Sequence, residues 1–261
     1  MKNIVYFFSG TGNSFYTAKK AAAKLECECR DIADTMNNNG EKEAFEKALI
    51  VFPSYGYGAP SPVLRFLKNL PFSAEYIAIA VTCGSYSEGT MHSAKRVLKR
   101  RKVVPSFYLE IGAPENFLPI FGAPKEALLE RRLKILDEKT NELILAMTEE
   151  RTNDVRGLKP FSAIVSHIFL AFLPILALFM RTGKKSCTSC GLCAKFCPMK
   201  AIKMRKKGGI RIRKTKCAMC QRCLNVCPRK CITLARVSKK SGRYFHPDVK
   251  ISELKAKQKD N

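Results

Sequence analysis

The chain has 261 residues, of which 46% are hydrophobic and 26% charged, and this length and composition allow about two domains with a buried core. Its formal net charge is +25, and the excess is uneven, because residues 181–261 hold 24 Lys and Arg against 3 Asp and Glu. A basic surface attracts acidic proteins, anionic membranes or nucleic acid. No recognition motif accompanies the charge, which disfavours a specific nucleic-acid partner.

An apolar run at Ile4–Phe8 predicts a first strand, and a helical pattern follows from about Asn13 to Leu25. The run is shorter than the hydrophobic region of a secretory signal peptide, and no small-residue cleavage site follows it. We therefore expect a cytoplasmic protein rather than one built on a disulfide framework.

The sequence SGTGNS, at residues 9–14, stands between this strand and this helix. The start of a helix directs unpaired N–H groups and a positive dipole end at such a loop, which suits a phosphate. The loop lacks the spacing of a P-loop and of a dinucleotide fingerprint. Its uncharged hydroxyl and amide groups suit a phosphate monoester, and it resembles the FMN-phosphate loop of flavodoxins. The candidate phosphate-binding residues are Ser9, Gly10, Thr11, Gly12, Asn13 and Ser14.

The rest of the first half alternates strand and helix patterns, which is typical of βαβ units around a parallel sheet. Strands are predicted at about 27–32, 48–52, 76–82 and 103–110, and helices at about 61–70, 90–101 and 124–149. Five strands fit the flavodoxin-like order 2-1-3-4-5, in which FMN binds beyond the carboxyl ends of the strands. We therefore expect residues 1–150 to form a doubly wound α/β domain that binds FMN.

Two loops follow the third and fourth predicted strands, PSYGYGAP at 53–60 and TCGSYSEGT at 82–90. Tyrosines can stack on a flavin ring, and glycines allow close approach of the backbone. Either loop alone is typical of ordinary turns. Together, behind SGTGNS, they favour a flavin, with the candidate ring-flanking residues Tyr55, Gly56, Tyr57, Cys83, Gly84 and Gly89.

An uncharged apolar segment of twenty residues occupies 161–180 and is just long enough to span a bilayer. A span would separate the parts of the chain on its two sides, and Pro174 with the polar Ser162 and Ser166 weakens it further. We expect residues 151–182 to be a linker helix that packs on the domains or in a homodimer. Attachment to a membrane surface is the second interpretation.

The sequences CTSCGLCAKFCP at 187–198 and CAMCQRCLNVCP at 217–228 repeat one pattern. Its spacing, C-x2-C-x2-C-x3-C-P, is the one with which bacterial ferredoxins hold 4Fe–4S clusters, the fourth cysteine ligating the other cluster. One predicted cluster has the ligands Cys187, Cys190, Cys193 and Cys227. The other has the ligands Cys217, Cys220, Cys223 and Cys197.

A zinc site is the alternative to this interpretation, and four cysteines lie outside the predicted ligand sets. Zinc is usually held by two separated CxxC pairs and does not require a fourth cysteine before proline. Cys231 is interpreted as core filler, with a spare cluster ligand as the alternative. Cys27, Cys29 and Cys83 have no spacing partner and are expected to be ordinary thiols.

The chain as a whole resembles fusions of a flavodoxin domain with a two-cluster ferredoxin. The resemblance rests on FSGTGNS, FPSYGYGAPSPVLRFLKNL, GAPENFLP, both cysteine motifs and the tail GRYFHPDVKISEL. It implies FMN and two 4Fe–4S clusters, with a ferredoxin domain at 183–237 and a basic tail at 238–261. Within that tail, we expect Tyr244 to pack over a cluster.

The expected function is electron transfer between FMN, the two clusters and an external redox protein, which the basic charge predicts to be acidic. No constellation of a general acid, base or nucleophile is visible, so no substrate is predicted. The alternative is a flavin-dependent reductase that uses the clusters as an internal wire. A basic binding module stabilised by zinc is the third possibility.

Overall fold

The computed structural model describes residues 2–36, 42–84, 87–154 and 160–254. Its first half is built on a five-stranded sheet with the order β2-β1-β3-β4-β5, in which all neighbouring strands are parallel. The strands are β1 (Ile4–Phe7), β2 (Glu28–Asp31), β3 (Glu43–Pro53), β4 (Phe72–Cys83) and β5 (Phe107–Gly112). This order confirms the predicted flavodoxin-like topology.

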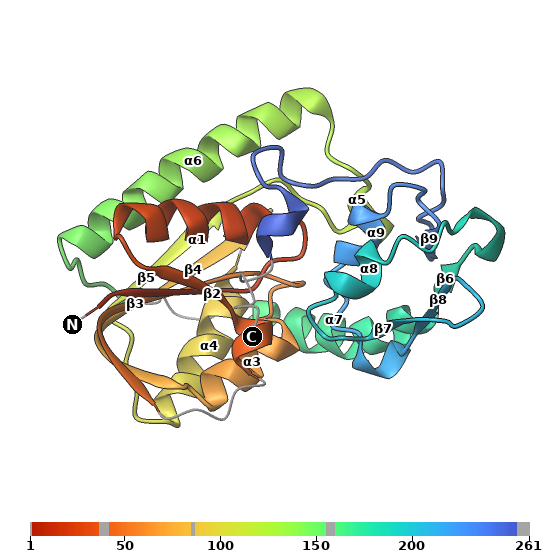
Figure 1. Ribbon diagram of the computed structural model, residues 1–261. Helices are drawn as coiled ribbons and strands as arrows, with labels where there is room; N and C mark the ends of the chain where they lie inside the picture. Colours follow the sequence, from red (N-terminus) through yellow and green to blue (C-terminus); the bar gives the residue numbers. More distant parts are fainter. Residues whose placement is uncertain (1, 37–41, 85–86, 155–159, 255–261) are drawn as a thin grey trace.

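Helices cover both faces of this sheet (Figure 1). The helices α1 (Asn13–Lys24) and α6 (Glu126–Thr148) pack on one face, and α3 (Ser61–Lys68) and α4 (Glu88–Lys99) on the other. The short helices α2 (Ile32–Thr35) and α5 (Leu118–Phe121) lie in connections. Since successive side chains of a strand point to opposite faces, β1 sends Ile4 and Tyr6 into one core and Val5 and Phe7 into the other.

The predicted elements of this half are present, with shifted boundaries. The fifth strand begins at Phe107 rather than at about 103. Pro105 explains the difference, because proline has no N–H to donate to a sheet ladder. The third strand begins at Glu43, five residues before the apolar run at 48–52 that predicts it.

The second half contains two small antiparallel sheets and two short helices (Figure 1). Strand β6 (Met180–Thr182) pairs with β9 (Ile232–Leu234), and β7 (Ile202–Met204) pairs with β8 (Ile210–Ile212). The helices α8 (Leu192–Lys195) and α9 (Arg222–Val226) each contain the third cysteine of a motif. The two motifs thus form two similar halves of one small domain.

Helix α7 (Pro160–Leu178) joins the two parts. Leu173, Leu176 and Ala177 are buried in the core of the second domain, so this side of the helix packs on that domain. Its opposite face exposes the large side chains Ile168, Phe172, Ile175 and Leu178. Among the described residues, no helix has the length and hydropathy that crossing a membrane requires.

The tail after the second motif returns to the first domain, where it lies beside α1 (Figure 1). Val249 and Leu254 are buried in the same core as α1 and α6. The 3-10 turn Ile251–Leu254 ends the described chain. The segment predicted as a basic tail therefore contributes to the core of the flavodoxin-like domain over its described residues.

Candidate functional site

A cavity of about 220 Å³ lies at the carboxyl ends of the parallel strands. This is where open α/β sheets bind their ligands. The predicted phosphate loop and both predicted ring-flanking loops contribute to its wall. Of the predicted residues, the lining includes Ser9, Gly10, Thr11, Asn13, Ser14, Tyr55, Gly56, Tyr57, Cys83 and Gly84.

Two predicted residues lie outside this lining. Gly12 is the residue before α1 and has a φ of 105°, a conformation that favours glycine. A side chain there would also meet the Cβ of His246 at 2.7 Å. Gly12 therefore shapes the turn and contacts the tail. Gly89 lies in the first turn of α4, and the structure does not bring it to the cavity.

Two hydrogen bonds of serine side chains hold the phosphate loop, one within the loop and one to β4. Ser9 Oγ accepts a hydrogen bond from the Gly12 N–H at 3.1 Å, and Ser14 Oγ and Thr82 Oγ1 share one at 2.7 Å. In the part of the chain that the structure describes, no side chain caps the N-terminus of α1. The first backbone N–H groups of α1 are the donors that a helix leaves for a phosphate.

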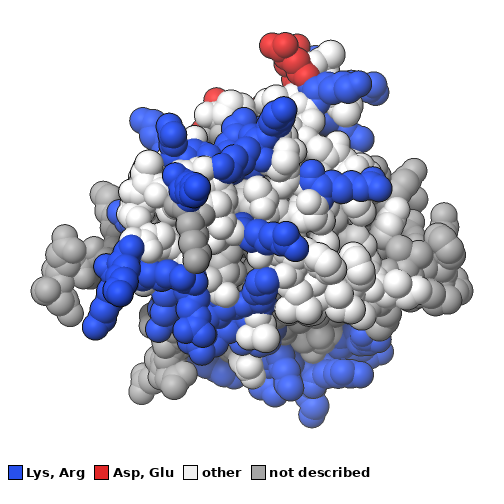
Figure 2. Space-filling model, turned by 90° about the vertical axis from the view of Figure 1, so that its right-hand side faces the viewer, with Lys and Arg blue, Asp and Glu red and all other residues white. Residues whose placement is uncertain are grey.

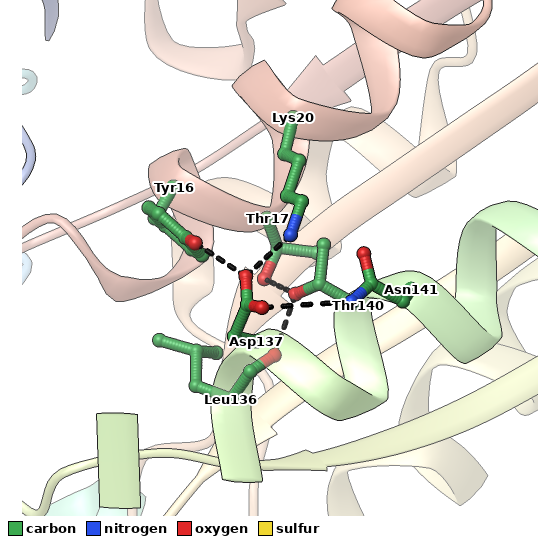
Figure 3. Close-up of polar contacts among 7 residues, drawn as sticks. All are labelled: Tyr16, Thr17, Lys20, Leu136, Asp137, Thr140 and Asn141. Atoms are coloured by element: carbon green, nitrogen blue, oxygen red, sulfur yellow. Dashed lines mark hydrogen bonds and ion pairs between the residues drawn. The ribbon is translucent and has the colours of Figure 1, made fainter. Parts of the chain in front are cut away.

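Helix α1 is fixed by polar contacts to α6 (Figure 3). Thr17 Oγ1 and Thr140 Oγ1 share a buried hydrogen bond of 2.9 Å. The Asp137 carboxylate of α6 accepts hydrogen bonds from the Tyr16 hydroxyl, at 2.5 Å, and from the Lys20 ammonium group. These contacts set the position of α1, and with it the orientation of the amides that face the phosphate loop.

The sequence interpretation gave no role to the loop after β5, which also lines the cavity. The Glu115 carboxylate accepts hydrogen bonds from the N–H groups of Asn116 and Phe117, at 3.0 and 3.1 Å. Asn116 Nδ2 donates to Thr11 Oγ1, which ties this loop to the phosphate loop. The segment GAPENFLP contains these residues, and its place directly after a strand is the signal that identifies it.

The second domain closes one side of the cavity. Met219, Cys220 and Gln221 belong to the second cysteine motif and line the cavity beside the phosphate loop. A side chain at Gly10 would come within 2.3 Å of the Cys220 carbonyl oxygen, so the two loops meet backbone to backbone. The Tyr55 hydroxyl, near the same point, is buried and has no hydrogen-bond partner among the described residues. An orphaned buried donor of this kind fits a bound group that supplies an acceptor.

Arg222 anchors the second motif to the first domain. It is buried, and its guanidinium donates to the carbonyl oxygens of Ser9 and of Phe196, the latter at 3.0 Å. It also lies 3.6 Å from Asp31 Oδ2 at the end of β2. Burial raises the pKa of the Asp31 carboxyl to about 6, and the positive charge of Arg222 opposes that shift.

The eight motif cysteines gather around two small cavities in the crossed arrangement that the spacing predicts. One cavity, here the inner thiol cavity, is lined by Cys197, Cys217, Cys220 and Cys223. The other, the outer thiol cavity, is lined by Cys187, Cys190, Cys193 and Cys227. In each set the fourth cysteine comes from the other motif, as in two-cluster ferredoxins.

The backbone around the two cavities repeats itself. Positive φ angles occur at Ser189 and Met219 and at Lys200 and Lys230, equivalent positions thirty residues apart. Backbone N–H groups approach ligand sulfurs, as at Ala201 N to Cys197 Sγ, 3.2 Å. Hydrogen bonds to sulfur are one means by which proteins tune iron–sulfur clusters. The donor set and the repeated turns therefore fit two clusters.

Burial strongly affects the thiols of the inner cavity. It raises the pKa of the Cys220 thiol to about 12 and that of the Cys223 thiol well above its usual value. Such thiols become thiolates only against a compensating positive charge, which bound metal provides. No three His, Cys, Asp or Glu side chains in the described ranges converge on the position of a single metal ion.

Tyr244 does not pack over a cluster as expected but reaches the phosphate loop. Its hydroxyl donates to Asn13 Oδ1 at 2.6 Å, and its N–H donates to Asn225 Oδ1 of α9 at 2.9 Å. Two residues on, the His246 N–H donates to the Thr11 carbonyl at 2.8 Å, and its ring stacks on Tyr16. The prediction failed because the tail crosses to the first domain before it ends.

Comparison with known proteins identifies the second domain. Residues 181–234 match the family model of the 4Fe-4S dicluster domain. No curated protein matches the chain. The match supports iron–sulfur chemistry at the two thiol cavities in place of the zinc-stabilised module considered above.

Solved structures similar to this chain cover its first half. One is the Trp repressor binding protein from Bacillus subtilis, with 14% identity, a TM-score of 0.37, and coverage of 54% of this chain and 97% of that one. Another is a short-chain flavodoxin associated with a non-canonical PDU bacterial microcompartment, with 16% identity, a TM-score of 0.30, and coverage of 55% and 97%. The strand order itself carries the fold assignment. Residues 181–234 thus form a 4Fe–4S dicluster domain, fused to a domain with flavodoxin-like topology.

Proposed function

We propose that the protein is an electron-transfer iron–sulfur flavoprotein, with FMN in the cavity of the first domain and 4Fe–4S clusters in the two thiol cavities. One observation carries the proposal: Cys220, a ligand of the inner thiol cavity, also lines the flavin cavity. A flavin there would lie against the loop that holds the inner cluster. When bound, FMN supplies one- or two-electron chemistry, whereas each cluster carries one electron.

The positions of two cysteines support a sequence in which electrons pass between the flavin, the clusters and the partner. Cys220 adjoins the flavin cavity, whereas Cys190, in the outer thiol cavity, is exposed. The inner cluster would therefore exchange electrons with FMN, and the outer cluster with an external partner. Residues 181–261 hold 24 Lys and Arg against 3 Asp and Glu, so an acidic redox protein fits this domain best.

The cavity wall also favours a second candidate function, the flavin-dependent reductase. The Glu115 carboxylate lies in that wall, where a substrate above the flavin could meet it. For such an enzyme, Glu115→Gln should slow flavin reoxidation by the substrate and leave exchange between flavin and clusters unchanged. For a carrier, the substitution should leave both rates unchanged.

Identification of the flavin tests the proposal directly. Protein purified without oxygen should contain FMN rather than FAD. The loop at 9–14 suits a single terminal phosphate, and the sequence of the first domain shows no motif for binding an adenine. Thr11→Ala and Ser14→Ala should each weaken FMN binding, on the order of 1–3 kcal/mol if the lost hydrogen bond involves the charged phosphate. The matched control is Ser93→Ala, whose hydroxyl donates to the Thr90 carbonyl away from the cavity. FAD in the extract, or unchanged FMN affinity in a variant that carries both Thr11→Ala and Ser14→Ala, contradicts the proposal.

The electron path has its own test. Cys220→Ala should remove the inner cluster and sharply slow reduction of the outer cluster after the flavin is photoreduced. The two clusters and the flavin can be followed separately by electron paramagnetic resonance and by absorbance. Unchanged exchange between flavin and outer cluster in this variant would rule out the order proposed here.

A further inference from the structure

Five thiols, rather than four, line the outer cavity. Cys231 stands beside the four predicted ligands in its wall and is buried, with 3% of its surface exposed. Its Sγ lies 3.4 Å from the Sγ of Cys227, the crossing ligand. At this separation the two sulfurs are in direct contact, so an iron atom bound by one is within reach of the other after a small rotation.

A tight turn brings the fifth thiol back to the fourth. Lys230 has a φ of 45°, and its N–H donates to the Cys227 carbonyl at 3.0 Å. The residue after this turn therefore returns to the position of the ligand that precedes it. Strand β9 begins immediately afterwards, and the Cys231 carbonyl accepts a hydrogen bond from Gly183 N–H at 2.9 Å.

The first motif contains the same turn without the thiol. Lys200 has a φ of 47°, and its N–H donates to the Cys197 carbonyl at 3.0 Å. The next residue there is Ala201, which is buried to the same degree as Cys231, with 2% of its surface exposed. Since alanine fills this position in one half of the domain, packing does not require a sulfur atom in the other. The thiol of Cys231 is thus a chemical difference between two geometrically equivalent sites.

We propose that Cys231 is a reserve ligand of the outer cluster, able to hold the iron atom that Cys227 holds. In the exchange, the iron–sulfur bond to Cys227 breaks and the bond to Cys231 forms. The thiol proton of Cys231 passes to the sulfur of Cys227, so no electron and no net charge is gained or lost. The outer cluster, which has an exposed ligand in Cys190, would thereby survive loss of its crossing ligand. Among the described residues, no fifth thiol lines the inner thiol cavity.

Alanine substitutions and iron counts test this assignment, which rests on the dicluster domain and not on the flavin. The full-length protein should contain about eight iron atoms per chain, as two 4Fe–4S clusters require. Cys231→Ala should leave this number unchanged. Cys227→Ala should also retain about eight iron atoms, with an altered electron paramagnetic resonance signal of the reduced outer cluster. The double variant Cys227→Ala/Cys231→Ala should lose the outer cluster, so that iron falls to about four atoms per chain.

The internal repeat provides a matched control. Cys197→Ala should lose the inner cluster, because Ala201 offers no thiol in the equivalent position. Adding Ala201→Cys to that variant should restore the lost iron. Restored iron in Cys197→Ala/Ala201→Cys would show that a thiol at this position can replace the crossing ligand. The geometry would then be tested even if Cys227→Ala failed to fold.

Two results would overturn the proposal. One is a Cys227→Ala protein with as little iron as the double variant, which would make Cys231 core filler. The other is an outer-cluster signal in Cys227→Ala that is unchanged by the further loss of Cys231, which would mean that another group had replaced the ligand. A wild-type protein without two clusters would instead refute the function proposed above.

Discussion

Arg222 shows how a single residue couples the two domains. It follows Cys220 by two positions, and its guanidinium contacts Ser9 of the phosphate loop and Asp31 of β2. Removing one partner of a buried ion pair commonly costs about 3–5 kcal/mol, because the other charge remains buried. The loop that holds the inner cluster and the loop that would hold the flavin phosphate are thus positioned by one shared side chain.

Residues that lie close together in the sequence can be grouped by their spacing, whereas contacts between distant residues cannot be predicted in this way. The cysteines that line the two thiol cavities could be grouped from the sequence because each motif lies within twelve residues. Arg222 and Tyr244 contact the phosphate loop across more than 200 residues, at Ser9 and Asn13 respectively. No periodicity or spacing in a single sequence encodes such a contact, so these residues emerge only from the fold.

His246 gives a prediction about pH. Burial lowers the pKa of its imidazole to about 4, although the nearby Asp248 carboxylate opposes the shift. The tail segment Tyr244–Leu254, when docked on the first domain, therefore binds fewer protons than when it is released into solvent, where its histidine titrates near 6.5. Docking is complete above about pH 6.5 and weakens as the pH falls from there towards 4. The first pH unit below 6.5 should cost about 1 kcal/mol of docking free energy.

Hydrogen exchange of the tail amides measures this effect, after correction for the intrinsic dependence of exchange on pH. Protection between Tyr244 and Leu254 should fall between pH 7.5 and 5.5. The His246→Gln variant, which cannot titrate, should lose most of that dependence. Equal pH dependence in the two proteins would show that another group controls the tail.

At the scale of elements, apolar patterns predict whether a segment is a strand or a helix. They do not predict the residues at which it begins and ends. The run at 76–82 marks only the continuously buried part of β4, which begins at Phe72 because its first residues still pair with β3 and ends at Cys83, which pairs with Gly112 of β5. The destination of the tail was missed for a related reason. Its apolar residues, among them the buried Val249 and Leu254, show no helical or strand period, although they complete the core beneath α1.

Helix α7 carries a prediction at the same scale. Ile168, Phe172 and Ile175 form an exposed apolar stripe, with 66%, 48% and 51% of their surfaces exposed. The basic Arg181 and Lys185 follow the helix, and Lys214 donates to the carbonyl of its last residue, Leu178. An apolar stripe bordered by basic residues is typical of a surface that binds anionic lipid. Two such basic faces would repel each other in a dimer.

We therefore expect the protein to co-sediment with vesicles that contain phosphatidylglycerol and not with neutral vesicles. Phe172→Ser/Ile175→Ser should reduce binding at least tenfold, since burying each side chain contributes about 1.5–3 kcal/mol. Val104→Ser, at a similarly exposed site on the first domain, is the control. Absence of vesicle binding by the unmodified protein contradicts the prediction. Self-association that the double substitution abolishes would identify the stripe as a dimer interface.

The whole molecule is electrically asymmetric. Figure 2 shows Lys and Arg distributed over the end of the molecule formed by the dicluster domain, with very few Asp or Glu. From 155 to 247 the sequence contains no Asp or Glu at all. Thiolate ligands and bound clusters would offset part of this charge near the cavities, but the exposed lysines and arginines of the β7–β8 loop face solvent. Such a one-sided field steers an oppositely charged partner towards one end of a protein.

Electron exchange with an acidic ferredoxin should therefore slow steeply as salt rises. Exposed charges are screened over about 8–10 Å at physiological ionic strength, so the effect should appear mainly in the association rate. Replacing Arg205, Lys206 and Lys207 with Glu should lower that rate at least tenfold at low salt and flatten its dependence on salt.

The matched control reverses Lys99, Arg100 and Arg101, which are equally exposed but lie at the end of α4 in the first domain. Stopped-flow measurement of cluster reduction would distinguish the two variants. If both reversals lower the rate equally, net charge rather than the position of the loop governs the encounter. If neither does so, the basic residues serve only solubility.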